Sequence, residues 1–236
     1  MRSFPPSVSS RRLRWFLALP KLGVVLLLAA VVTLLWLLHQ NELEEERSGL
    51  IKDALWLEQN VRFHLARSDE QLQELAADLG SQPDKKRIFR IRASHMVKNN
   101  PDISQIVWFD AKHRVIDALP AATPADSGVD AFGPAATQKA FELATVLNKR
   151  IYSESFFLSG NVAHFALVMP IFGDKEVAGM LVAIHSLEDL LGTLVPWWFT
   201  EKYRVVVVDD NGTQYAAKSN VSGTPNLSYE LPFDPP

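Results

Sequence analysis

The stretch that decides the fold is IYSESFFLSGNVAHFALVMPIFGDKEVAGMLVAIHSLEDLL, residues 151–191. Two long apolar runs in it, 162–172 and 177–184, have the composition of strands and are separated by the turn sequence Gly173-Asp174-Lys175-Glu176. A shorter run of mixed character, 150–157, predicts a further strand. Strands joined by short turns pair antiparallel, because a parallel connection needs a crossover of a dozen or more residues. The stretch therefore predicts an antiparallel sheet.

The flanking sequence completes an α+β domain. The order of predicted elements is helix, two strands, helix, three strands and a short helix. This order is satisfied by one five-stranded antiparallel sheet flanked by helices, over residues 84–195. The elements before and after the three strands are helix 85–99, strand 103–109, turn 110–113, strand 114–119, a small-residue loop 120–136, helix 137–147 and helix 187–194.

A second copy of this pattern begins near residue 196. When Asp110 is superimposed on Asp209, VWFDAKHRVIDA faces VVVDDNGTQYAA, at an offset of 99 residues. Two predicted strands, 203–208 and 213–217, are too few for a stable sheet domain. We therefore expect residues 196–236 to be the beginning of a second, incomplete unit, in a chain that is a fragment of a longer protein or a truncated gene product.

The N-terminal region carries a membrane signature. Leu22–Leu38 reads LGVVLLLAAVVTLLWLL, without one formal charge, and would span roughly 26 Å as a helix. Residues 1–21 hold five basic residues and no acidic one, whereas glutamates follow the segment. The positive-inside rule then predicts a cytoplasmic N-terminus, a transmembrane helix at 22–38 and the bulk of the chain outside the membrane. A cleaved signal peptide is the alternative, although no small-x-small cleavage site follows.

A long helix is predicted over 42–80. Leucines recur at a spacing of seven, with one register shift between Leu57 and Leu65. Such a helix needs a partner along its apolar stripe. The partner is the following domain, the same helix of a second subunit, or both, and we expect a homodimer.

Composition excludes several classes of function. The 236 residues include no cysteine, and the net charge is −3, so disulfide scaffolds, thiolate metal sites and a generic nucleic-acid binder are not expected. The six histidines show no metal-ligand spacing. No G-x-S-x-G elbow is present, and neither an H-[ED]-x-x-x-P phosphoacceptor box nor a glycine-rich ATP lid occurs. We expect no cofactor, no metal, no catalytic residue and no enzymatic activity of this chain itself.

Three stretches together resemble the double Cache extracellular sensors of bacteria, in particular sensor histidine kinases of the dicarboxylate-sensing type. They are Pro101-Asp102-Ile103 with the strand after it, residues 151–191, and PWWFTEKYRVVVVDDNGTQYAA at 196–217. The resemblance implies two PAS-like units in the periplasm, the first of them membrane-distal and binding a small ligand such as an organic acid or an amino acid. It also implies that a dimer of a two-component sensor transmits the signal across the inner membrane to a kinase transmitter in the longer parent. Chemoreceptors and diguanylate cyclases use the same input module, and an anchored partner-binding module without a ligand is a further alternative.

A ligand pocket in such a domain is expected on the sheet face beneath residues 120–148. Arg150 is the candidate that would bind a ligand carboxylate with two hydrogen bonds. The other candidates supply hydroxyl groups at strand spacing or wall the pocket, and they are Tyr152, Ser153, Ser155, Trp108, His164 and Phe165. Plainer interpretations stand beside these: a solvated or ion-paired surface residue for Arg150, half-buried packing for Tyr152, a surface or core histidine for His164, and core packing for Trp108 and Phe165.

Overall fold

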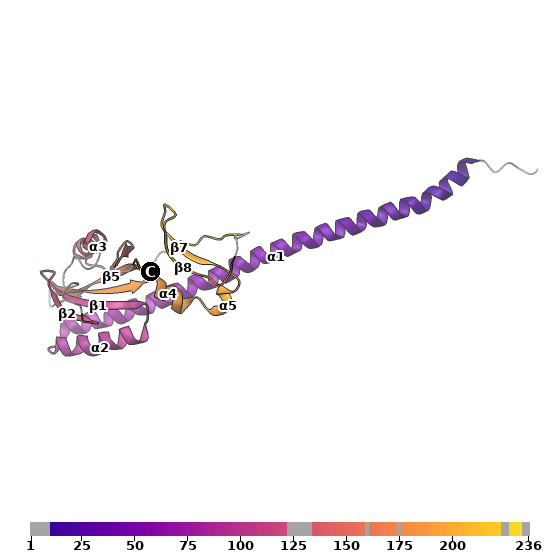
Figure 1. Cartoon of the computed structure of the whole chain (residues 1–236). Helices are drawn as coiled ribbons and strands as arrows, with labels where there is room; N and C mark the ends of the chain where they lie inside the picture. The colour runs from indigo at the N-terminus through magenta and orange to yellow at the C-terminus, as the bar shows by residue number, and fades with distance from the viewer. Residues whose placement is uncertain (1–9, 122–133, 159–160, 174–175, 223–226, 233–236) are drawn as a thin grey trace, which may run out of the picture. The chain divides into compact units, whose positions relative to one another are not determined.

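The computed structural model describes residues 10–121, 134–158, 161–173, 176–222 and 227–232 (Figure 1), without the side chains of 10–22, 38–43 and 134–135. The chain divides into two compact units, Met1–Ala54 and Leu55–Pro236. The helices are α1 (Ser10–Ser81), α2 (Lys85–Asn99), α3 (Pro134–Leu147), α4 (Leu187–Leu194) and α5 (Trp197–Thr200). The strands are β1 (Ile103–Asp110), β2 (Val115–Leu119), β3 (Ile151–Tyr152), β4 (Phe156–Phe157), β5 (Ala163–Phe172), β6 (Val177–Ser186), β7 (Val205–Val208) and β8 (Gln214–Lys218).

The first unit consists, in its described part, of the N-terminal portion of α1. The helical backbone of α1 continues through Pro20 and Gly49, so that the two helices expected at 22–38 and 42–80 form one element. Across the described residues, no helix meets the combination of length and hydrophobicity that a membrane span requires. The predicted anchor, Leu22–Leu38, extends one residue at each end beyond the described side chains of 23–37.

The second unit is built on an antiparallel sheet, which confirms the predicted α+β class. The strand order is β2-β1-β6-β5-β3, and β4 pairs with the same strand, β5, as β3 does. The single strand expected at 150–157 is therefore two short strands. Ser153 accounts for the interruption, because its hydroxyl accepts a hydrogen bond from the backbone amide of Ala166 and so takes the place of a regular ladder contact.

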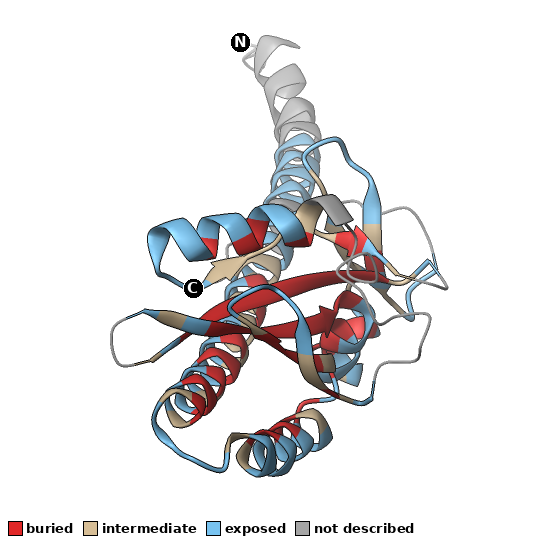
Figure 2. Ribbon diagram, turned by 90° about the vertical axis from the view of Figure 1, so that its left-hand side faces the viewer, coloured by how far each residue is buried: buried red, intermediate tan, exposed pale blue. Residues whose placement is uncertain are grey.

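The two faces of the sheet pack against different helices. Figure 1 shows α2 and the C-terminal part of α1 along one face and α3 on the other. Along β5, alternation sends Leu167 and Met169 to the face under α1 and α2, whereas Ala166 and Val168 face α3. The central strands β1, β5 and β6 and the inner sides of the helices packed on them are accordingly mostly buried (Figure 2).

The leucine stripe of the predicted long helix packs within its own unit. Leu65, Leu72 and Leu79 are almost completely buried against the sheet and its connections. Each fully buried leucine contributes about 1.5–3 kcal/mol, so the stripe supplies a large part of the free energy that holds α1 on the sheet. The following domain is therefore one partner of this stripe.

The hairpin expected near residue 205 is present as β7 and β8, a two-stranded antiparallel sheet. Gly212 in its turn has φ +80°, a conformation that glycine adopts without strain. The Lys218 ammonium group donates to the carbonyl oxygens of Leu191, Gly192 and Val195 at 2.6–3.3 Å. This hairpin is thus fastened to the C-terminal end of α4.

Candidate functional site

Arg150 forms an ion pair with Asp69, the first element of the candidate site. Arg150 directly precedes β3, and Asp69 lies in the C-terminal part of α1. The Asp69 side chain is 5% exposed and the Arg150 side chain 40%, so solvent reaches the guanidinium far better than the carboxylate. Burial raises the pKa of the Asp69 carboxyl above its ordinary value, and the charge of Arg150 only partly offsets that increase.

Tyr152 lies beside this ion pair, as its spacing of two from Arg150 on the strand predicts. Its ring packs against Phe165, with 6.1 Å between the ring centroids. Burial, followed by the negative charge of Asp69, raises the pKa of the Tyr152 hydroxyl. Within the described residues, the Tyr152 hydroxyl, the Ser68 hydroxyl and Oδ1 of Asp69 are buried without a hydrogen-bond partner. Unpaired polar atoms therefore accumulate around the ion pair.

The two predicted serines do not line a common surface with Arg150. The Ser153 hydroxyl donates to the carbonyl oxygen of Glu154 at 2.8 Å and accepts from the amide of Ala166 at 2.9 Å. Its hydrogen bonds thus maintain the local backbone. Ser155 is half-buried between β3 and β4, where the strand alternation that would pair it with Ser153 is interrupted.

The remaining predicted residues divide between the two faces of the sheet. Trp108 packs on Phe89 under α2, with 5.7 Å between centroids, and Phe165 lies on the same face toward α1 and α4. His164 points to the opposite face and stacks on Phe156 at 6.3 Å. Burial lowers the pKa of His164, whose Nδ1 lies 2.9 Å from the carbonyl oxygen of Val162. The structure therefore groups Arg150 and Tyr152 with Phe165, and leaves His164 apart from them.

The expected pocket beneath residues 120–148 is only partly within the described chain. Residues 122–133 of that segment lie outside it. In the described part of this region, a depression is lined by His113, Gln138, Phe141 and Glu142, and not by the predicted site residues.

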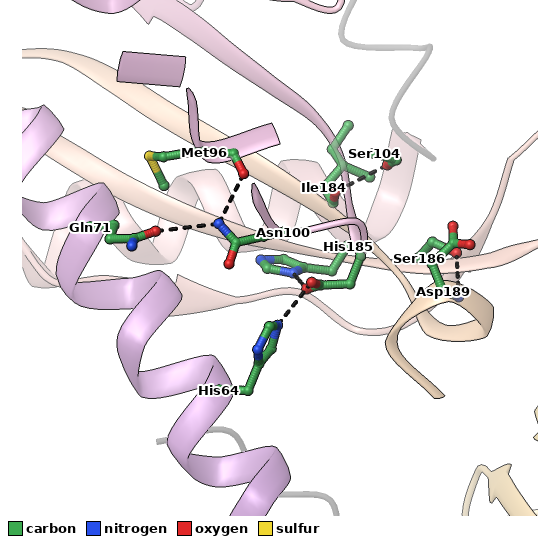
Figure 3. Close-up of polar contacts among 10 residues, drawn as sticks. His64, Gln71, Met96, Asn100, Ser104, Ile184, His185, Ser186 and Asp189 are labelled. Atoms are coloured by element: carbon green, nitrogen blue, oxygen red, sulfur yellow. Dashed lines mark hydrogen bonds and ion pairs between the residues drawn. The ribbon is translucent and has the colours of Figure 1, made fainter. Parts of the chain in front are cut away.

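A second polar cluster under α1 was not predicted. The buried carboxylate of Asp102 lies 2.8 Å from Nε2 of His64 and 2.8 Å from Nδ1 of His185. Figure 3 shows the two imidazoles approaching from α1 and from the end of β6. Burial alone would raise the pKa of Asp102, but the hydrogen bonds from His185 and His64 outweigh it, and the pKa lies well below its ordinary value. The cluster connects α1 to the ends of β1 and β6.

Both clusters had a weak signal in the sequence. Ser68 and Asp69 lie between Leu65 and Leu72 on the stripe that packs on the sheet, where polar residues are unexpected. Asp102 lies in the Pro101-Asp102-Ile103 stretch that carried the family resemblance. Among the described residues, no group of three or more acidic or histidine side chains is arranged to hold a metal ion.

Comparison with known proteins supports the resemblance to a sensor. No protein-family model matches the chain. It is 27% identical over 242 residues to the C4-dicarboxylate transport sensor protein DctS of Rhodobacter capsulatus, an alignment that covers 98% of this chain and 33% of DctS. The stated resemblance to a dicarboxylate-type sensor is thus confirmed by this relative, of which the chain spans about a third.

The chain also has partial similarity to solved structures of chemoreceptor ligand-binding domains. The ligand-binding domain of the Pseudomonas aeruginosa PAO1 amino acid chemoreceptor PctC, in complex with GABA, has 18% identity and a TM-score of 0.49, covering 71% of this chain and 73% of that one. The ligand-binding domain of the Pseudomonas fluorescens chemoreceptor CtaA, in complex with L-serine, has 12% identity and a TM-score of 0.44, covering 67% of each chain. Neither similarity assigns a ligand to this chain.

Proposed function

We propose that this chain is the extracytoplasmic input region of a membrane-anchored sensor, and that its parent is a two-component sensor histidine kinase. The second unit binds a small carboxylate ligand, and a homodimer transmits the binding event across the membrane. Residues 1–21 are cytoplasmic, 22–38 cross the membrane, 84–195 form the membrane-distal ligand-binding domain, and 196–236 begin a second PAS-like domain. The similarity to DctS supports the sensor role.

The observation that carries this proposal is the continuity of α1 from Ser10 to Ser81. Its C-terminal part supplies Leu72, Leu75 and Leu79 to the core under the sheet. Its N-terminal part exposes every described side chain over 23–37, and nearly all of them are apolar. An exposed apolar helical segment is energetically unfavourable in water and stable in a bilayer. One helix therefore includes both the proposed anchor and the wall of the proposed sensor domain.

The Arg150 guanidinium supports an anionic ligand. It is the partly exposed cation of the candidate site, and its planar donors match a carboxylate. Tyr152 and Phe165 supply an aromatic wall beside it, as is usual for small-molecule sites.

A thermal-shift titration of the full chain in detergent tests the proposal. Succinate, malate and fumarate are the probes, and methylamine and glucose are the non-carboxylate controls. A ligand at 100 times its Kd stabilises the folded state by about 2.7 kcal/mol, so a saturable rise in Tm with at least one dicarboxylate is expected. A cooperatively unfolding chain whose Tm responds to none of the carboxylates would leave the partner-binding module as the better reading.

A further inference from the structure

Arg150 already binds a carboxylate, and that carboxylate belongs to α1. The ion pair with Asp69 joins the residue directly before β3 to the C-terminal part of α1. A carboxylate ligand that binds Nη1 of Arg150, the nitrogen that pairs with Asp69, therefore competes with Asp69. The accessibility is asymmetric, since the Arg150 side chain is 40% exposed and the Asp69 side chain 5%. A ligand can approach the cation from solvent while the internal carboxylate stays buried.

The Asp69–Arg150 ion pair lacks the additional hydrogen bonds that a permanent structural ion pair usually has. Within the described chain, Oδ1 of Asp69 and the hydroxyl groups of Ser68 and Tyr152 are buried without hydrogen-bond partners. A buried ion pair stabilises a fold only when further hydrogen bonds satisfy its remaining atoms. Burial also disfavours the charged form of Asp69, as its raised pKa indicates. The contact therefore stabilises the fold less than a fully hydrogen-bonded ion pair would.

We propose that Asp69 is a built-in competitor for the ligand: its carboxylate occupies Arg150 in the ligand-free protein, and a ligand carboxylate displaces it and releases α1 from β3. The inference rests on the proposed function and adds how binding is converted into a change at the helix. The ligand gains a guanidinium partner, and α1 loses a link to the edge of the sheet. Binding therefore favours one of two packings of α1, which is the condition for a ligand to shift their populations.

The neighbouring Asp102 cluster differs at its carboxylate, although Nε2 of His185 is itself buried without a hydrogen-bond partner among the described residues. Both oxygens of the Asp102 carboxylate accept hydrogen bonds at 2.8 Å, from His64 and His185. His64 lies five residues before Asp69 on the same helix. The His64 link stays in place while the Asp69 link exchanges, so that the release of α1 is local and begins about one turn beyond His64.

The affinity test compares Asp69→Asn with Asp78→Asn in the full chain in detergent. Asp78 is also on α1 and pairs with Arg92 at 2.9 Å. The Asp78→Asn substitution therefore removes one charge and one ion pair from the same helix, as Asp69→Asn does. Asparagine cannot compete electrostatically for Arg150. Asp69→Asn should tighten succinate binding by about tenfold, the factor that corresponds to about 1.4 kcal/mol, whereas Asp78→Asn should leave the Kd unchanged. Arg150→Ala should abolish binding, and Arg150→Lys should weaken it.

The release itself is measured by thiol labelling, because the chain contains no cysteine. A Ser68→Cys variant places a single thiol at a side chain that is 1% exposed, next to Asp69. Its maleimide labelling rate should rise when succinate is added. Ala93→Cys, on α2 in the same core and 0% exposed, should label slowly with and without succinate.

The outcomes separate this inference from the proposed function. Succinate binding that is equally tight in wild type and Asp69→Asn would overturn the competitor role and leave the sensor proposal intact. Unchanged labelling of Ser68→Cys at saturating succinate would do the same. No response of the wild-type chain to any carboxylate would remove both proposals. If Asp69→Asn fails to fold, the labelling of Ser68→Cys decides, because that variant keeps Asp69: a rate that rises with succinate supports the competitor role, and an unchanged rate overturns it.

Discussion

Phe165 stacks on His185, with 4.9 Å between ring centroids and 8° between ring planes. It also packs against Tyr152. One ring therefore contacts Tyr152, which lies beside the Asp69–Arg150 ion pair, and His185, which belongs to the Asp102 cluster.

Replacing Phe165 by alanine should destabilise the chain by about 3–5 kcal/mol, the usual loss for a buried phenylalanine. The reason is a cavity in contact with both clusters, since the side chain is 2% exposed. Phe157→Ala, on β4 and 44% exposed, is the control and should lose about 1 kcal/mol. Urea unfolding followed by circular dichroism compares them. Equal losses would contradict the bridging position of Phe165.

Asp102 should make the fold sensitive to acid. Its pKa is lower in the folded state than its ordinary value of 3.8. A carboxyl with a lowered folded pKa contributes stability above its unfolded pKa and loses it as the pH falls through the folded pKa. Between pH 5 and pH 3 the wild type should therefore lose more free energy of unfolding than Asp102→Asn, by at most about 1.4 kcal/mol per pH unit. Glu70→Gln, an exposed position on α1, should follow the wild type, and parallel curves for wild type and Asp102→Asn would refute the expectation.

The sheet could be predicted from the sequence because its information is local. Apolar runs such as 162–172 and 177–184 and the turn between them fix the pairing of neighbouring strands. The two polar clusters are different, because their partners are distant in sequence: Asp102 and His185 are 83 residues apart. The leucine periodicity of the predicted long helix also does not indicate which residue of a strand pairs with a polar residue on that helix. Arg150 and Tyr152 were identified for their chemistry, but their partner Asp69 was not.

The split of the predicted strand 150–157 has a similar origin. Its alternation suggested that Ser153 and Ser155 share one face, and that reading assumes a regular ladder. The Ser153 hydroxyl instead bonds to the backbone of β5, a choice that serine and threonine make where geometry permits. Whether the side chain or the backbone of Ser153 forms the hydrogen bond depends on the neighbouring strand β5. The sequence pattern of residues 150–157 alone carries no information about that strand.

Lys218 should be the main residue that holds the β7–β8 hairpin against α4. Its ammonium group satisfies three carbonyl oxygens at the end of that helix, where a positive charge is also favoured by the helix dipole. Lys218→Met keeps the aliphatic stem and removes the charge, and should destabilise by about 1–3 kcal/mol. Lys149→Met, at an exposed position, is the control and should be near neutral. Hydrogen exchange of the last turn of α4 should accelerate only in Lys218→Met; protection equal to wild type would contradict the role.

Two glycines should respond to alanine with opposite signs. Gly179 lies on β6 opposite Asp110, and a Cβ there would collide with the carbonyl oxygen of Phe109. Because that oxygen belongs to the backbone of a central strand, it cannot move without disturbing the ladder, and Gly179→Ala should destabilise by at least about 1–3 kcal/mol. Gly192 lies within α4, and a Cβ there meets nothing within 4 Å. Gly192→Ala should therefore stabilise by about 1 kcal/mol through helix propensity. Thermal unfolding of the two variants decides, and a stabilised Gly179→Ala would mean that β1 and β6 are not as closely apposed as this register requires.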